Sequence, residues 1–131
     1  DLVRAAALAT GCDGAVTFSG RSTVMRNNEV LTRLWSERMA TAGVADGHPV
    51  AELSGSSDMG NVSLVMPAIH PCIAICDEGV AGHSTEFRDA AAMPRADTVA
   101  LLAATLVAQT AWALLADPAL VEAAWQEHRG G

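Results

Sequence analysis

The residues of this 131-residue chain that could carry chemistry are foremost its four histidines and three cysteines. His83 lies in the stretch EGVAGHSTEF, between Gly82 and Ser84. Glycine allows a close backbone approach and Ser84 is a suitable N-cap, so we expect His83 at a rigid junction between a loop and a helix. A neutral imidazole at such a junction makes a good metal ligand. A proton carrier and a histidine without function remain open alternatives.

Three further potential zinc ligands, His70, Cys72 and Cys76, precede His83 in the chain. If Cys72 and Cys76 lie on one strand, they are about 13 Å apart at about 3.3 Å per residue. This spacing disfavours one zinc ion, because both sulfurs must lie about 2.3 Å from the metal. We therefore expect buried, free thiols in a reducing cytoplasm rather than a four-ligand zinc site.

A loop rich in glycine and serine, SGSSDMGNVS, spans residues 54–63. Its glycines permit tight turns, and its hydroxyls, Asp58 and Asn61 offer polar groups to a ligand. The loop lacks the lysine and the glycine spacing of a phosphate-binding loop. A plain turn, in which Asp58 and Asn61 satisfy backbone groups, is the alternative.

The elements that must position these residues follow from periodicity and capping signals. Helical spacing or caps predict helices over residues 2–10, 28–43, 85–92, 96–116 and from 118 onward. The expected N-caps are Asn27 or Asn28 for the second of these helices and Asp117 for the last. Short apolar or alternating runs predict strands or extended segments over residues 13–20, 62–66 and 71–76. This order indicates a mixed α/β fold with a boundary near residues 20–28. We expect Trp35, Trp112 and Trp125 in the core, and we expect residues 99–116 to form a buried helix rather than a membrane span.

Composition excludes several classes of protein. Half of the residues are hydrophobic and 18% are charged, which indicates a folded chain. The formal net charge of −7 argues against a nucleic-acid partner. The chain opens DLVRAAALATG, as if partway through a helix and without a signal peptide, so we expect part of a longer protein.

Two motifs in fixed order carry a family resemblance. GSSDMGNVSLVMPAIHP is followed by GHSTEF and by a long apolar helix that ends AWALLADPAL. This order resembles the C-terminal part of the metal-dependent amidohydrolases, which comprise aminoacylase, carboxypeptidase G and p-aminobenzoyl-glutamate hydrolase. The branch of aminoacylase-like dipeptidases is the most similar, and the resemblance runs from about Leu2 to His128.

The resemblance implies an enzyme with an α/β/α catalytic domain and a ferredoxin-like α+β lid that often forms a dimer. Residues 1–25 would be the end of the lid, and residues 26–131 the C-terminal part of the catalytic domain. Such enzymes hydrolyse an amide bond of an N-acyl amino acid, a dipeptide or an aminobenzoyl-glutamate-like substrate. They use one or two divalent ions, zinc or manganese, to activate water, with a glutamate as general base.

The resemblance also implies roles for individual residues. His83 falls on a metal ligand of the family. The residues implied at the substrate pocket are Gly55, Ser56, Asp58, Asn61 and His70, the last without a firm role. The other metal ligands and the glutamate base would come from the N-terminal portion of the same enzyme, because the chain contains no H-x-D or E-E motif. We therefore expect the isolated chain to be inactive. The expected partners of the whole enzyme are a small amide substrate and a second copy, with no membrane. The alternative is a truncated, inactive copy that serves as an interaction or oligomerisation module.

Overall fold

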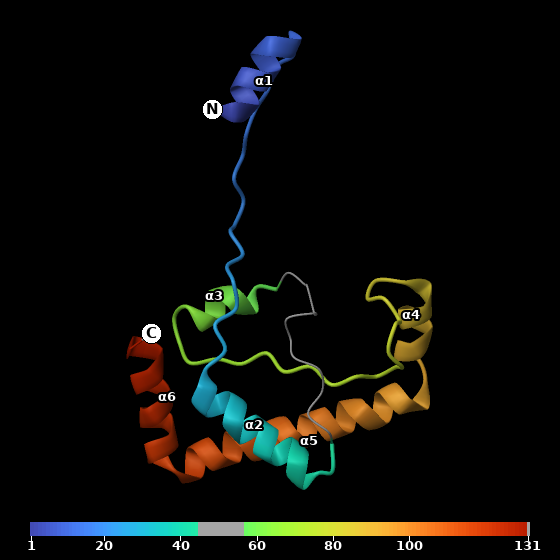
Figure 1. Cartoon of the computed structure of the whole chain (residues 1–131), viewed down its shortest axis with the longest axis vertical. Helices are drawn as coiled ribbons and strands as arrows, with labels where there is room; N and C mark the ends of the chain where they lie inside the picture. Colours follow the sequence, from blue (N-terminus) through green and yellow to red (C-terminus); the bar gives the residue numbers. More distant parts are fainter. Residues whose placement is uncertain (45–56, 131) are drawn as a thin grey trace.

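The computed structural model describes residues 1–44 and 57–130. Helices joined by irregular segments make up this part of the chain (Figure 1). In chain order the helices are α1 (Leu2–Thr10), α2 (Glu29–Thr41), α3 (Met59–Ser63), α4 (Thr85–Ala91), α5 (Pro94–Ala116) and α6 (Pro118–Gly130). Helices α2 to α6 form a body, whereas α1 stands away from it (Figure 1). We call residues 1–20 the arm and residues 21–27 the linker.

Helix α2 begins where an asparagine can satisfy its free backbone N–H groups. Asn28 is extended, and its side-chain oxygen accepts the N–H of Leu31 at 3.1 Å. Beyond the cap, apolar residues recur at helical spacing, and Leu31, Leu34, Trp35 and Met39 are buried. This face packs on α5 and α6. The predicted helix, its Asn28 cap and its end at Gly43 are confirmed, since Gly43 takes a φ of 70° just after the helix.

Helix α6 is joined to the start of α2 by two polar side chains. The Nδ2 group of Asn28 donates to the carbonyl oxygen of Ala124 at 3.0 Å. The carboxylate of Glu127 accepts the N–H groups of Glu29 at 2.9 Å and Val30 at 3.3 Å. A carboxylate is favoured there because the N-terminus of a helix carries partial positive charge. The two helices are thereby joined at one end by three hydrogen bonds.

The core lies between α2 and α5. Trp35, Met39 and Leu106 form the buried cluster, and Leu106 is only 1% exposed. Around it pack the partly buried side chains of Val44, Ile69, Ile73 and Leu102. The irregular segment that contains Ile69 and Ile73 therefore runs over the core between α3 and α4 (Figure 1).

Helix α5 is buried on one side only, which corrects the expectation of a fully buried helix. Its buried residues are Ala96, Leu106 and Thr110. Trp112, expected in the core, is 72% exposed, because it lies away from the side of α5 that packs on α2. The remaining exposed large apolar residues of α5 are Leu101, Val107 and Leu115. In the described part of the chain, α5 alone is long and apolar enough to cross a membrane, a criterion that a core helix also meets.

Most of the predicted helices are confirmed. Helix α1 ends at Gly11 with a φ of 66°, and α4 closely matches the predicted 85–92. Helix α5 begins at Pro94, two residues earlier than predicted, with the proline in its first turn. Asp117 caps α6 as predicted, since its carboxylate accepts the N–H of Ala119 at 3.0 Å.

The segments predicted as strands do not form strands in the described ranges. Residues 13–20 are irregular and exposed, residues 62–63 belong to α3, and residues 71–76 are irregular. A strand needs a neighbouring strand to pair its backbone groups, and among the described residues only helix α1 lies beside residues 13–20. Around residue 62 the backbone turns instead, with the N–H groups of Val65 and Met66 donating to the carbonyl of Val62. The α/β architecture of a larger catalytic domain and the boundary at residues 25–26 stay predictions.

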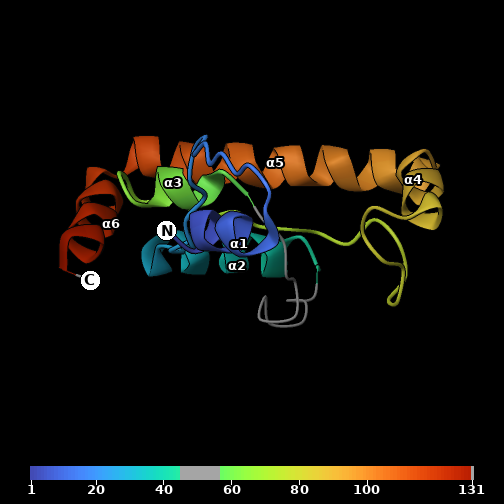
Figure 2. The same cartoon turned by 90° about the horizontal axis from the view of Figure 1, so that it is seen from above.

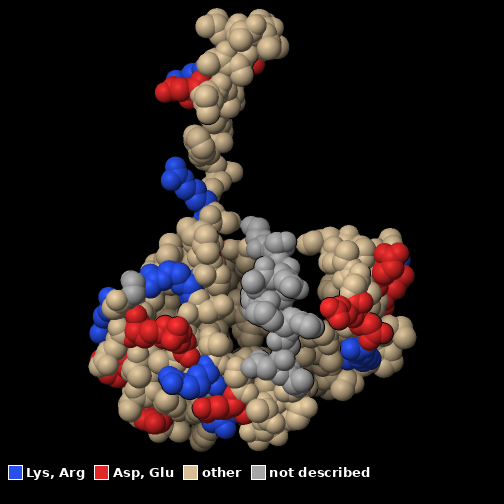
Figure 3. All heavy atoms as spheres, viewed as in Figure 1, with Lys and Arg blue, Asp and Glu red and all other residues tan. Residues whose placement is uncertain are grey.

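The chain has a large surface for its mass. The accessible surface is 9900 Å², whereas a compact monomer of this mass has about 6,500 Å². The arm contributes to the excess, because its residues are exposed apart from the half-buried Ala7. Charged side chains gather on the body and at α4, and the arm shows few (Figure 3).

Candidate functional site

His83 occupies the junction that its sequence predicts. It lies two residues before α4, its side chain is exposed, and its φ is 62°. It is the one non-glycine residue with a positive φ in the described chain. Ser84 is the N-cap, and its hydroxyl accepts the N–H of Phe87 at 3.1 Å. The cap fixes the start of α4, so the backbone at His83 is held in a conformation that L-residues adopt at a cost.

A carboxylate follows His83 on the first turn of α4. The backbone N–H of Glu86 itself, and then the hydroxyls of Thr85 and Ser84, hold the pKa of this carboxyl below its ordinary value. The Thr85 hydroxyl donates to Glu86 at 3.0 Å. Because Glu86 stays ionised, it places a negative charge at the N-terminal end of α4.

The second predicted site lies just before α3. The Ser57 hydroxyl accepts the N–H of Met59 at 3.2 Å and lies 3.5 Å from Nδ1 of His70. Asp58 is exposed, and its carboxylate makes no hydrogen bond to the described residues. Ser57, Asp58 and His70 therefore lie around one exposed stretch, with Asp58 available to a ligand. Gly55 and Ser56, also predicted there, fall outside the described residues.

Asn61 is engaged with the linker. Its Oδ1 atom accepts the N–H of Thr23 at 3.2 Å and the hydroxyl of Thr23 at 3.1 Å. Its Nδ2 atom donates to the carbonyl of Arg21 at 2.8 Å. Both acceptor positions of the amide oxygen are thus occupied, as in the alternative of a structural turn. A substrate contact by Asn61 stays a prediction, and only its second N–H is free for one.

The two predicted parts of the site are not adjacent in the described structure. Helices α3 and α4 lie near opposite ends of α5 in both views (Figures 1 and 2). Helix α5 has 23 residues, which corresponds to about 35 Å at about 1.5 Å per residue. Within residues 1–44 and 57–130, no three His, Cys, Asp or Glu side chains come together as a metal group.

The described residues therefore fit one ligand of a metal site rather than a whole site. His83 suits that role, since its ring is exposed and neither ring nitrogen is hydrogen-bonded to another described residue. A catalytic zinc ion takes about three protein ligands. The remaining ligands would have to come from polypeptide outside the described residues.

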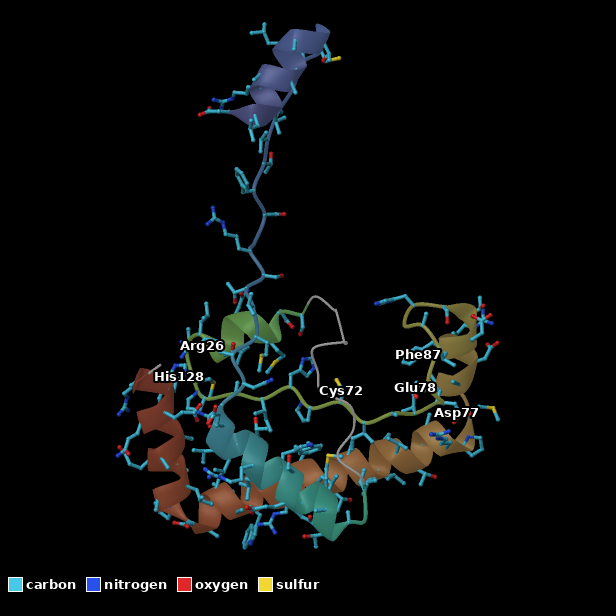
Figure 4. All side chains as sticks on the ribbon, viewed as in Figure 1. Arg26, Cys72, Asp77, Glu78, Phe87 and His128 are labelled. Atoms are coloured by element: carbon cyan, nitrogen blue, oxygen red, sulfur yellow. The ribbon has the colours of Figure 1, made fainter. Side chains whose placement is uncertain are left out.

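The cysteines are free, as predicted, but they are not buried. Cys12 and Cys72 are exposed and Cys76 is half-buried. Cys72 lies on the irregular segment between α3 and α4, at a distance from Asp77 and Glu78 beside α4 (Figure 4). Burial was expected from a strand inside a sheet, and the described segment has no strand neighbour to cover it. Next to Cys76, Asp77 pairs with Arg95 of α5 at 2.7 Å and ties this end of the segment to the helix.

Two hollows in the described surface do not contain the predicted site residues. One, of about 450 Å³, lies within the arm between Leu2, Val16 and Phe18. The other, of about 160 Å³, lies between Leu31, Met66 and Trp125. Both are mainly apolar, so neither offers the convergent polar groups of a catalytic pocket.

Sequence reasoning missed the contacts that hold these elements. The roles of Glu127 at α2 and of Asn61 at the linker join residues far apart in sequence. The sequence around Glu127 and around Asn61 does not indicate which distant residues they bond. The αL backbone of His83 could have been suspected from its place between Gly82 and an N-cap, where helices are preceded by tight turns.

Comparison with known proteins gives two curated relatives. The chain is 33% identical over 135 residues to the "Xaa-Arg dipeptidase" of Mus musculus and 33% identical over 128 residues to that of Homo sapiens. The alignments cover 98% and 93% of this chain, but only 31% and 29% of the relatives. The chain thus spans less than a third of their length, in their C-terminal portion. No family model and no solved structure matches. The similarity supports a relationship to dipeptidase-like amidohydrolases.

Proposed function

We propose that this chain is the C-terminal segment of a metal-dependent amidohydrolase that cleaves a dipeptide or a related amide. The observation that carries the proposal is 33% identity to a dipeptidase along 98% of the chain. The ordered pair of motifs, GSSDMGNVS and GHSTEF, points in the same direction. N-acyl amino acids and aminobenzoyl-glutamate-like compounds are further substrates of this chemistry. We also place the enzyme in the cytoplasm, in keeping with its free cysteines.

His83 is the proposed metal ligand of this segment. The capped start of α4 fixes its backbone, so the imidazole is presented from a constrained position. The ion would be zinc or manganese, one or two per complete site, and it would lower the pKa of a bound water and polarise the scissile carbonyl. The contribution of this chain is to hold and orient the imidazole. The general base and the other ligands would come from the remaining polypeptide.

Asp58 is the proposed contact to substrate on the other part of the site. Its carboxylate is exposed and engages no other described side chain. A carboxylate can form charge-assisted hydrogen bonds with a basic side chain. The relatives are named for Xaa-Arg dipeptides, and these are therefore the first substrates to test. Gly55, Ser56, Asn61 and His70 complete the proposed lining.

A second candidate function is an inactive copy that acts as an interaction or oligomerisation module. The observation in its favour is the exposed apolar side of α5, which includes Trp112 and Leu115. Such a surface requires a partner, whether another part of the same enzyme or a second copy. The two candidates differ in whether the full-length protein hydrolyses an amide.

The test is an assay of the full-length protein on Xaa-Arg dipeptides, other dipeptides and N-acyl amino acids. We expect hydrolysis that a chelator abolishes and that zinc or manganese restores. The Asp58→Asn variant should lose more activity on Xaa-Arg than on Xaa-Leu dipeptides, whereas Asp117→Asn, at the start of α6, should not change this ratio. Absence of hydrolysis on every substrate class with either metal would favour the inactive module.

A further inference from the structure

The linker and α3 are joined by a set of hydrogen bonds that the proposed chemistry does not require. We propose that Asn61 is a positioning residue, which fixes the linker to the segment that borders the substrate pocket. The proposal rests on the proposed function for its catalytic consequence. The contact itself follows from hydrogen bonds alone.

Asn61 makes three of these bonds with two linker residues 38 and 40 positions earlier in sequence. Thr23 donates both its N–H and its hydroxyl to Oδ1, at 3.2 and 3.1 Å. The Nδ2 group of Asn61 donates to the carbonyl oxygen of Arg21 at 2.8 Å. An asparagine has both a donor and an acceptor, so one side chain can hold a backbone N–H and a backbone C=O together.

The residues on both sides of Asn61 bring α3 close to the linker. A Cβ atom at Gly60 would overlap the carbonyl oxygen of Thr23, so only glycine permits this approach. Ser63 is fully buried, and its hydroxyl accepts the N–H of Arg26 at 3.0 Å and donates to the Gly60 carbonyl at 2.7 Å. Helix α3 is therefore seated on the linker along most of its length.

Of the contacts between α3 and the linker, those of Asn61 lie nearest to the arm along the chain. In the described chain, α1 packs on no other helix, and the arm stands away from the body (Figure 1). Gly20, at the end of the arm, has a φ of 49°, a conformation that glycine adopts freely. The arm can thus change direction at Gly20, while Asn61 holds the chain from Arg21 onward.

A shift of the linker would also shift α3 and the proposed pocket residues that precede it. The N–H of Met59, the first residue of α3, donates to Ser57, which lies next to Asp58 and 3.5 Å from His70. If Asn61 releases the linker, α3 loses one of the contacts that hold it, and the pocket residues next to α3 lose their fixed position relative to the linker. We expect poorer substrate binding rather than loss of the metal.

The experiment compares Asn61→Ala, Asn61→Asp and Thr23→Val in the full-length protein. Asn61→Ala removes all three bonds, whereas Asn61→Asp removes only the Nδ2 donor and Thr23→Val only the hydroxyl. Asn27→Ala is the matched control, because Asn27 is an exposed linker asparagine whose side chain bonds to no described residue. Hydrogen exchange is followed at the N–H groups of Thr23 and Arg26, together with bound metal, kcat and KM on the best dipeptide.

We expect exchange at Thr23 to be about two- to tenfold faster in Asn61→Ala, as the loss of a hydrogen bond implies. KM should rise about tenfold in Asn61→Ala and about threefold in the other two variants, with bound metal unchanged and Asn27→Ala like wild type. Unchanged exchange at Thr23 would overturn the contact. Faster exchange with unchanged kcat and KM would overturn the positioning role. A wild-type protein without hydrolysis would instead contradict the proposed function, and the exchange data would still decide the contact.

Discussion

The Nδ2 group of Asn28 donates to the carbonyl oxygen of Ala124 across 3.0 Å, which joins the first turn of α2 to the middle of α6. Asn28 is 4% exposed, and its oxygen caps its own helix through the N–H of Leu31. One buried side chain therefore caps α2 and also joins α2 to α6, through two residues that are 96 positions apart in sequence.

The first prediction concerns this joint. Asn28→Ala should lower the free energy of unfolding by about 2 to 3 kcal/mol, because it removes both an N-cap and the buried hydrogen bond to the Ala124 carbonyl. Asn28→Ser should cost less, about 1 to 2 kcal/mol, since serine keeps an N-cap acceptor and only the donor to Ala124 is lost. Urea unfolding followed by circular dichroism measures the effect. Asn27→Ala, the exposed neighbour, is the control, and an Asn28→Ala protein as stable as this control would contradict the assignment.

The contrast between helices and strands shows what the sequence can predict here. The caps at Asn28, Ser84 and Asp117 act on N–H groups within three residues, so local sequence contains their full signal. A strand depends on a partner strand, and residues 13–20 have none among the described residues. Their alternation predicted a conformation that only a neighbour could stabilise.

The candidate site follows the same rule: its local features could be predicted from the sequence, and its long-range contacts could not. The junction at His83 follows from local residues, and the structure has the predicted cap. The bond between Asn61 and Thr23 could not be predicted, because it depends on how two segments meet in space. Trp112 was misplaced for a similar reason, since an apolar periodicity does not say which side of a helix is covered.

The second prediction concerns pH and α4. The pKa of Glu86 is lowered in the folded chain, so its contribution to stability is present above the unfolded pKa and is lost as pH falls through the folded pKa. Thr85→Ala removes a hydroxyl donor and should raise the pKa of Glu86 toward its ordinary value. An NMR titration of the side-chain carboxyl carbons measures it, with Glu122 in α6 as an internal reference. A titration midpoint of Glu86 that does not move in Thr85→Ala would contradict the role of this hydroxyl.

The third prediction concerns the exposed side of α5. The isolated chain should self-associate, because Trp112 and Leu115 are 72% and 79% exposed on one helix. Replacing both by Gln should reduce association and leave the unfolding temperature within a few degrees, since neither side chain is buried. Sedimentation velocity measures the association. Leu106→Ala, in the core, should instead cost about 3 kcal/mol of stability. Equal association of the double variant and wild type would rule out this surface.

The central claim is that His83 is a metal ligand of an amidohydrolase, and the most direct measurement is the metal content of the full-length His83→Asn and His83→Gly proteins. Both residues tolerate the φ of 62°, so these variants remove the imidazole without adding strain at the junction. His128→Asn is the control, because the ring of His128 contacts Trp125, 5.6 Å between centroids, in α6. We predict that His83→Asn and His83→Gly lose at least one bound ion per chain. Their rate should fall below about 1% of the wild-type rate, a loss of roughly 3 kcal/mol of transition-state stabilisation. The His128→Asn control should keep the wild-type metal content and the wild-type rate. Full metal content and an unchanged rate of amide hydrolysis in the His83 variants would contradict the claim.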